Sequence, residues 1–325
     1  MTPPYPLPEN ESRVLPCPRC QVKNRVLLHR AFVQPEGLRC GSCQASLLCA
    51  RDAPLRLGEI DYQHPLDRQS LTALEAVPGV TMLVKKLVEV TLERYDRLFN
   101  QSSFLRVSPL QLPTLHRLFE RAASRLGVAE LPELYLFEGQ SINAYTSGVD
   151  RPYVAVSSAL CDACDDDEVT CVLAHELAHW QSKHVLYKTA ARLLSVAAGE
   201  LLRTTLGLGN LLIVPLQLAL LKWDRCSELT ADRGMLLAAR DPQLALRVLM
   251  KLVGFSGRLR EELSLEAFMA QAQKARAAPE EGVLDRFYTL LQTASRTHPF
   301  PLWRAAELYS WACEGEYLSV LQRFA

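Results

Sequence analysis

Two histidines and a glutamate form the densest group of chemically capable residues in the chain. They belong to the sequence HELAHWQSKH at positions 175–184. On a helix, His175 and His179 lie on one face about one turn apart, so both imidazoles can bind a single zinc ion. Glu176 lies between them and can reach a water molecule that the zinc polarises. It can therefore take a proton from that water and pass it to a leaving amine, which predicts hydrolysis.

The residues around this pair decide between a metal site and an ordinary helix surface. The alternative interpretation of H-E-x-x-H is a helix with two solvated histidines, because short motifs also arise by chance. A buried helix would leave two unpaired imidazoles at a cost in free energy, unless a metal binds them. The surrounding positions are apolar and favour the metal site: Val169, Val172, Leu173, Leu177 and Ala178.

A helix running through His184 must hold the pair, and Asp165 to Asp167 offer an N-cap and negative charge at its start. Two earlier helices are predicted over residues 83–99 and 112–126, the second with a C-cap at Gly127. Alternating residues at 131–139 and 151–158 predict strands, separated by a loop that contains NAYTSG (143–148). We therefore predict a mainly α fold with a small β-sheet, with this loop at the rim of the sheet.

A catalytic zinc site needs a third protein ligand and an open position for water. That ligand has to come from another part of the chain. The sequence WDRCSELTADRGMLLAARD (223–241) predicts a second apolar helix on which Glu228 and Asp232 lie one turn apart.

The longest apolar run precedes this helix, at residues 206–221, and contains Asn210, Pro215 and Gln217. A helix that spans a bilayer needs about 20 apolar residues. We predict a buried helical hairpin at this position, with a membrane segment as the alternative, since membrane helices tolerate proline.

Four segments, in order, resemble one known family. HELAHWQSKH (175–184) is followed by SELTADRGMLL (227–237), with NAYTSG upstream and THPFPLWRAAEL (297–308) downstream. This set resembles the HtpX-like gluzincin zinc metallopeptidases, which are related to the CAAX prenyl proteases, over residues 66–320. The resemblance implies an α+β zincin-type peptidase domain with metalloendopeptidase activity. The chain does not have the clear spanning helices of the membrane members, so it resembles a soluble branch.

The resemblance also implies roles for particular residues. Glu228 would supply the third zinc ligand, and Asp232 would brace a ligand histidine from behind. His298 would donate a hydrogen bond to the substrate carbonyl in the transition state. The residues implied to bind the substrate, with its backbone extended, are Asn143, Ala144, Tyr145 and Arg304.

Each of these roles has a simpler alternative. Glu228 and Asp232 could form a solvated carboxylate pair, which like-charge repulsion makes mildly unfavourable. His298 could be a loop histidine and Asn143 a turn former.

The amino-terminal region carries a second metal-binding pattern. CPRC (17–20) and CGSC (40–43) have the spacing of a four-thiolate zinc ribbon, in which no position stays open for water. A redox role for these pairs is the alternative. A third C-x-x-C, Cys161 with Cys164, is interpreted as two buried core thiols. The predicted ligands of a structural zinc are Cys17, Cys20, Cys40 and Cys43.

The overall composition restricts partners and location. The chain has 36 Lys and Arg and 36 Asp and Glu, so no net charge attracts nucleic acid or an anionic membrane. The sequence MTPPYPLPENESRV at its start has neither the basic nor the apolar region of a secretory signal. We therefore predict a cytoplasmic protein that contacts membranes at most peripherally.

These observations predict four regions: a disordered proline-rich tail at 1–12, a zinc ribbon at 13–50, a linker at 51–65 and the peptidase domain at 66–325. The leading hypothesis is a zinc endopeptidase, with one catalytic and one structural zinc, that cleaves extended or unfolded polypeptides. The ribbon would dock a protein partner or regulate activity. The rival hypotheses are a non-catalytic zinc-binding scaffold or adaptor and a membrane-attached peptidase.

Overall fold

The computed structural model describes residues 11–50, 53–91, 102–149, 151–191, 194, 210–254, 257–277, 298 and 300–324. Helices dominate these residues, and the predicted mainly α fold with a small β-sheet is confirmed. In chain order the helices and strands are β1 (Ser12–Pro16), β2 (Lys23–Leu27), α1 (Leu28–Val33), α2 (Pro65–Glu75), α3 (Val80–Thr91), β3 (Leu105–Arg106), α5 (Pro113–Leu126), β4 (Glu133–Phe137), β5 (Ala144–Ser147), β6 (Tyr153–Ser157), α6 (Ser158–Ala163), α7 (Asp166–Gln181), α9 (Asn210–Ala239), α10 (Pro242–Val253), α11 (Leu265–Ala277), α13 (Pro301–Glu314) and α14 (Glu316–Gln322).

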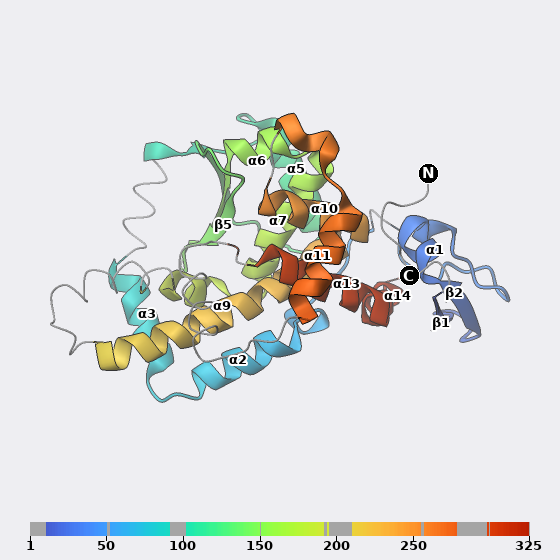
Figure 1. Cartoon of the computed structure of the whole chain (residues 1–325), viewed down its shortest axis with the longest axis horizontal. Helices are drawn as coiled ribbons and strands as arrows, with labels where there is room; N and C mark the ends of the chain where they lie inside the picture. The colour runs from blue at the N-terminus through green and yellow to red at the C-terminus, as the bar shows by residue number, and fades with distance from the viewer. Residues whose placement is uncertain are drawn as a thin grey trace.

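A four-stranded sheet lies beside α5 and α7 (Figure 1), with the strand order β3-β4-β6-β5. Strands β4 and β6 run parallel, whereas β5 is antiparallel to β6. Along β6 the side chains alternate between faces, so Val154 and Val156 enter the main core while Tyr153 enters an aromatic cluster on the other face. The segment at 143–148, predicted as a loop and a candidate edge-strand rim of the sheet, contributes the edge strand β5.

Helix α7 carries the H-E-x-x-H residues, and Asp165 caps its start as the sequence predicts. The Asp165 side chain accepts from the Glu168 backbone, and the Glu168 side chain accepts from the Asp165 backbone. This capping box satisfies two N–H groups that a helix start otherwise leaves free. The helix ends at Gln181 and not, as predicted, at His184, because Lys183 adopts a left-handed backbone with φ of 56°.

Helix α9 runs from Asn210 to Ala239, a length of about 45 Å. The predicted buried hairpin is therefore wrong for residues 210–221, which belong to the same helix as Glu228; residues 206–209 lie outside the described residues. Pro215 is exposed and lies inside this helix, where its missing N–H removes one backbone hydrogen bond. Within the described residues, no helix is both long and apolar enough to cross a membrane.

Helices α7 and α9 pack against each other, and the contact includes a residue of the H-E-x-x-H segment. Gly234 of α9 lies against Ala178 of α7, and a Cβ atom at position 234 would come within 2.5 Å of the Ala178 Cβ. Glycine is therefore what allows the two helices to approach this closely.

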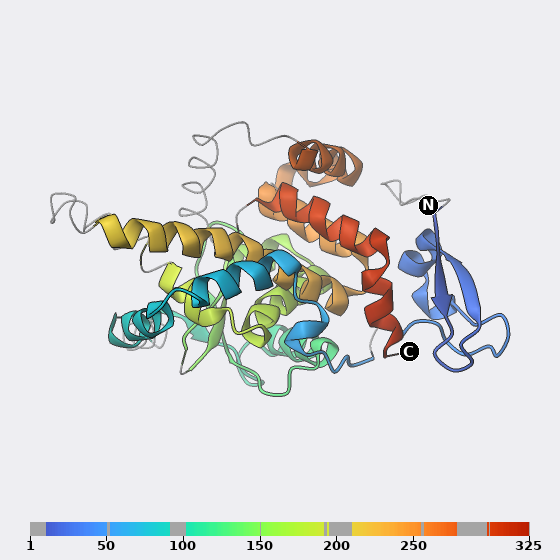
Figure 2. The same cartoon turned by 90° about the horizontal axis from the view of Figure 1, so that it is seen from below.

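The ribbon region forms one end of the molecule, beside α14 (Figure 2). Strands β1 and β2 pair antiparallel, and Ser12 already belongs to β1, so residue 12 is not part of a disordered tail. The first ten residues lie outside the described residues. Contacts join the ribbon to α14: the rings of Phe32 and Tyr317 are 6.2 Å apart, and Gln322 donates to the Pro16 carbonyl at 2.9 Å.

The segment between the ribbon and α2 packs into the domain. The prediction of a polar linker is wrong for residues 53–64, because Leu55, Leu57 and Tyr62 are buried in the main core. The Tyr62 hydroxyl donates to Gln181 at 2.7 Å, next to the end of α7. Gly127 has the predicted C-cap conformation, with φ of 73°, and the segment passes directly against it. The four predicted region boundaries otherwise stay a prediction.

Candidate metal centre

Helices α7 and α9 bring the three predicted zinc ligands together. The Nε2 atom of His175 lies 3.4 Å from Glu228 Oε2, and the Nε2 atom of His179 lies 3.2 Å from Glu228 Oε1. All three side chains are buried. Together with His298 they form a group whose potential ligand atoms all lie within 4.8 Å of one another.

The three residues fit a zinc ion by distance and by chemistry. Ligand atoms about 2.0–2.1 Å from a tetrahedral zinc lie about 3.3 Å from one another, which matches the two observed separations. The Nε2 atoms of His175 and His179 are buried and have no hydrogen-bond partner among the described residues. Lone pairs that face a buried carboxylate without a donor between them suit a cation.

Asp232 lies behind His175, one turn after Glu228 on α9. Its Oδ1 atom is 3.1 Å from His175 Nδ1. Arg304 on α13 binds the same carboxylate with two hydrogen bonds, of 2.8 and 2.6 Å, and approaches Glu228 Oε2 at 2.9 Å. The prediction that Arg304 binds substrate is wrong, because the side chain is 1% exposed and its guanidinium is directed at these two carboxylates.

Glu228 is surrounded by cations. Lys188 lies 2.6 Å from Glu228 Oε1 and 2.8 Å from Asp224, and Arg304 and His298 approach Glu228 Oε2. Burial alone would raise the pKa of Glu228, but Lys188, followed by His298 and Arg304, holds that pKa well below its ordinary value. The group therefore stays a carboxylate, the form that binds a metal.

Glu176 is fully buried, and its carboxylate is held from two sides. Thr146 of β5 donates to Glu176 Oε2 at 2.7 Å, while the other oxygen lies 3.3 Å from His298 Nε2. Burial alone would raise the pKa of Glu176, but His298 outweighs it and holds the pKa at about 2. A carboxylate so placed can accept a proton.

His298 lies between the metal ligands and the sheet edge. Its Nδ1 atom is 2.9 Å from Glu228 Oε2, and its Nε2 atom is 2.6 Å from the Ala144 carbonyl. Burial alone lowers the pKa of His298, but Glu228 and Glu176 raise it to about 10. Both ring nitrogens then carry protons, so the imidazolium can donate on both sides.

Among the described residues β5 is the edge strand of the sheet, and His298 lies against its outer side. The Asn143 carbonyl accepts from the Ser157 amide, so in this antiparallel pair the backbone groups of Ala144 and Thr146 point away from β6. The Tyr145 ring lies in the aromatic cluster, 5.8 Å from Phe137, on the other face of the sheet from the core. Of the predicted substrate-binding residues, Ala144 therefore contacts His298 directly, through its carbonyl oxygen.

Comparison with known proteins identifies the family to which this site belongs. The sequence model of peptidase family M48 matches residues 109–312, which contain all the residues of this cluster. This protein belongs to peptidase family M48. It is a zinc-dependent protease, and the rival hypothesis of a non-catalytic scaffold is not favoured.

Named relatives agree with the M48 assignment. The chain is 34% identical, over 85% of its length and 80% of the relative, to the chloroplastic plastoglobule-localized metallopeptidase 48 of Arabidopsis thaliana. It is 26% identical, over 65% of its length and 78% of the relative, to a protease HtpX homolog of Ralstonia nicotianae. The predicted resemblance to HtpX-like peptidases is confirmed.

Four residues of this M48 site were missed in the sequence. Thr146 contacts Glu176 and lies within the NAYTSG segment, whereas Lys188 contacts Glu228 and lies in no segment recognised from the sequence. His184 lies behind His179, with 3.0 Å between their Nδ1 atoms, and its Nε2 atom is 3.0 Å from Asp67 of α2. His184 is the last residue of HELAHWQSKH, so a third histidine beside the pair was the one available signal.

The ribbon of this M48 peptidase brings four thiols together. The sulfur of Cys17 lies 3.5 Å from that of Cys43, and the sulfur of Cys20 lies 3.6 Å from that of Cys40. Tetrahedral zinc with Zn–S distances of about 2.3 Å separates its sulfurs by about 3.8 Å, so the set fits zinc. The backbone N–H groups of Cys43 and Ser42 help to lower the pKa of Cys40 to about 6, which favours the thiolate.

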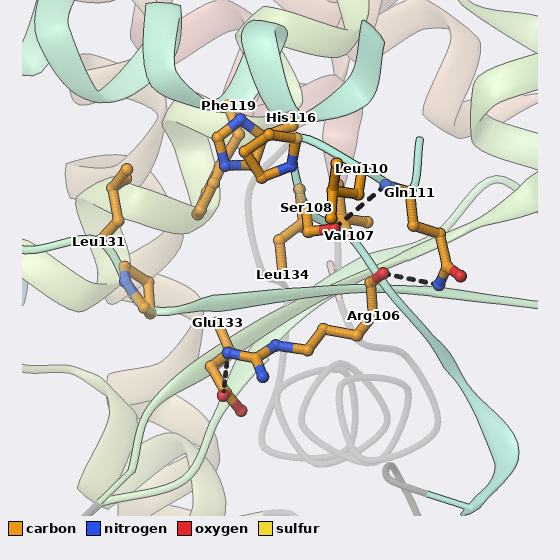
Figure 3. Close-up of a pocket in the computed structure, with 12 residues that line it drawn as sticks. Arg106, Val107, Ser108, Leu110, Gln111, His116, Phe119, Leu131, Glu133 and Leu134 are labelled. Carbon is orange, nitrogen blue, oxygen red and sulfur yellow. Dashed lines mark hydrogen bonds and ion pairs between the residues drawn. The ribbon is translucent and has the colours of Figure 1, made fainter. Parts of the chain in front are cut away.

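A surface cavity of about 630 Å³ lies at the opposite edge of the sheet from the M48 site, around β3 (Figure 3). Arg106 and Glu133 form an ion pair of 2.8 Å at its wall, and Gln111 donates to the Arg106 carbonyl at 2.8 Å. Strands β4 and β6 separate β3 from β5, and no member of the metal cluster lines the cavity.

Proposed function

We propose that this zinc-dependent protease is an endopeptidase that cleaves extended or unfolded polypeptides at the cluster of His175, His179 and Glu228. The observation that carries the proposal is that the Nε2 atoms of His175 and His179 lie 3.4 and 3.2 Å from the two oxygens of Glu228, with the Glu176 carboxylate between the histidines on α7. Zinc bound there would polarise both the attacking water and the scissile carbonyl.

Side chains of the protein would transfer the protons and stabilise the developing charge. Glu176 takes a proton from the water as it attacks and gives it to the nitrogen of the leaving amine. Thr146 holds one Glu176 oxygen, so the other is directed at the reaction. The protonated His298 donates its hydrogen to the carbonyl oxygen as negative charge develops there.

An extended substrate would lie along β5. The backbone groups of Ala144 and Thr146 are directed away from β6, and the Ala144 carbonyl already contacts His298, so a substrate segment would pair with the Ala144 amide and with Thr146 as an added strand. Such pairing requires a locally unfolded chain, because folded elements already use their own backbone groups. Asn143 would hold the start of β5 through its bonds to Ser157.

The direct test is hydrolysis of an unfolded casein-like substrate. The protein should produce internal fragments, a chelator should abolish the activity, and added zinc should restore it. Release of single terminal residues without internal fragments would contradict an endopeptidase. Undiminished hydrolysis after removal of zinc would contradict the assignment of the centre.

A substitution at His298 tests its role in the transition state. His298→Ala should lower kcat by about 10²–10³-fold and change KM much less, because the donor acts mainly on developing charge. Steady-state kinetics on a fluorogenic peptide measures both constants. An increase of KM with unchanged kcat would instead assign His298 to ground-state binding.

The ribbon is proposed to hold a second, structural zinc. The double variant Cys17→Ser with Cys20→Ser should lower the metal content from two zinc ions per chain to one. Peptide hydrolysis should continue, because the catalytic ligands lie on α7 and α9. Metal analysis beside a peptidase assay tests this, and a wild-type stoichiometry near one would contradict the two-site proposal.

Beyond its part in folding, we propose that the ribbon is a docking site for a protein partner. A cytoplasmic location also stays a prediction. The name of the Arabidopsis relative places that protein at the plastoglobules of the chloroplast.

A further inference from the structure

A buried chain of hydrogen-bonding groups leads from α2 to one of the metal-centre histidines. Asp67 Oδ2 accepts from Thr230 Oγ1 at 2.6 Å and lies 3.0 Å from His184 Nε2. The other nitrogen of His184 lies 3.0 Å from His179 Nδ1. The side chains of Asp67, His184 and His179 are completely buried, so no bulk water competes with these contacts.

Only one assignment of protons lets His179 bind a metal through Nε2. The Asp67 carboxylate can only accept, so a neutral His184 carries its proton on Nε2 and leaves Nδ1 as an acceptor. His179 must then donate from its own Nδ1 atom. Its Nε2 atom, 3.2 Å from Glu228 Oε1, is left with a free lone pair directed at the metal centre.

The opposite assignment would block the site. If His184 donated to His179 Nδ1, the neutral His179 ring would carry its proton on Nε2, where the metal binds. Asp67 disfavours this, because a neutral His184 that donates to Asp67 from Nε2 has no second proton to donate from Nδ1. The carboxylate itself is held in place by Thr230, by His184 and by its position in the first turn of α2, where the helix dipole favours negative charge.

The two α7 histidines are therefore fixed in different ways. His175 faces a carboxylate directly, through Asp232. His179 faces a second histidine, with the carboxylate one residue further away. We propose that His184 and Asp67 are positioning residues that hold His179 in its metal-binding tautomer, a role that builds on the proposed zinc centre.

Two substitutions of His184 separate this role from simple packing. An asparagine amide reaches the position of an imidazole Nδ1 atom, whereas a glutamine amide reaches that of Nε2. His184→Asn thus keeps an acceptor for His179, while His184→Gln keeps only the donor to Asp67. We expect His184→Gln to weaken metal binding at the catalytic centre by about 10- to 100-fold, and His184→Asn by less than about 10-fold.

The measurement is a titration of the full-length apoprotein with Co²⁺, followed by competition with Zn²⁺. Thiolate-to-cobalt charge-transfer bands report the ribbon, and the d–d bands of the nitrogen and oxygen site report the catalytic centre. Unchanged ribbon bands show that each variant is folded. Equal losses of affinity in His184→Asn and His184→Gln, or none in either, would overturn the proposal.

Asp67→Asn provides a second test that preserves shape. The amide can donate to His184, which releases the tautomer, so the affinity of the catalytic centre should fall by about 10-fold or more. Thr230→Val is the matched control, because it removes the Thr230 hydrogen bond but keeps the Asp67 carboxylate. The control should lose thermal stability and keep near wild-type affinity.

Wild-type affinity in Asp67→Asn would contradict the proposed role, whether or not the His184 variants fold. Normal metal binding with no hydrolysis in any protein would instead count against the proposed function alone.

Discussion

Glu176→Gln is expected to lower kcat for peptide hydrolysis by about 10²–10⁴-fold while the protein keeps its zinc. The amide has the shape of the carboxylate and can still accept the hydrogen bond from Thr146, which is 2.7 Å long in the wild type. It cannot take a proton from water at neutral pH. Turnover numbers on a fluorogenic peptide, with zinc per chain measured on the same sample, test both parts of the expectation.

The matched control for this substitution lies on the same helix. Glu168 is also buried in α7, but it contacts Lys251 and the Asp165 backbone, away from the metal centre. Glutamine can fill its place in the capping box, so Glu168→Gln should reduce stability and leave hydrolysis intact. If Glu176→Gln turned over like the wild type, Glu176 would not be the base.

Glu228→Ala is expected to empty the catalytic centre at micromolar free zinc, whereas Asp232→Asn should keep the metal. Removing Glu228 deletes the oxygen ligand and leaves the Lys188 ammonium beside two histidines, which repels a cation. Asp232 contacts His175 and Arg304 but lies behind the ligands, so its loss should reduce affinity or activity by about 10- to 100-fold. The two variants should therefore differ in zinc content and not only in activity.

Asp224 supplies the control for Glu228. It also binds Lys188, at 2.8 Å, but it does not belong to the group of potential metal ligands. Asp224→Asn should leave the zinc content unchanged. Metal analysis after equilibration in a zinc buffer compares all three variants, and full occupancy in Glu228→Ala would show that another residue is the third ligand.

The sequence predicted the metal ligands better than the residues that hold them in place. The reason is that a sequence pattern can encode geometry within one helix but not contacts between distant parts of the chain. H-E-x-x-H encodes its geometry within one helical turn, so His175 and His179 could be recognised from spacing alone. Glu228 required the resemblance to a family, because its distance along the chain says nothing about its position in space. Lys188 and Asp67 act through tertiary contacts that no local pattern records, and the NAYTSG segment that contains Thr146 does not reveal its contact with Glu176.

The errors in the fold also have physical causes. In the segment before α2, Leu55, Leu57 and Tyr62 are too few and too interrupted to form a periodic pattern, yet each is buried against the core. In α9, the hairpin prediction failed because Pro215 lies inside a continuous helix, in which its missing N–H removes one backbone hydrogen bond. Arg304 was assigned to substrate binding because the family motif gave its position but not its direction.

The contact of Gly234 with Ala178 bears on the size of ion that suits the centre. Because no side chain at position 234 holds α7 and α9 apart there, the imidazoles on one helix and the carboxylate on the other can lie at separations suited to metal–ligand bonds of about 2.0–2.1 Å. Calcium prefers distances of 2.3–2.6 Å and more oxygen ligands, so it would require the helices to move apart. A methyl group at position 234 would meet the Ala178 Cβ at 2.5 Å and push the two helices apart, so the glycine favours the short separations that a small cation requires.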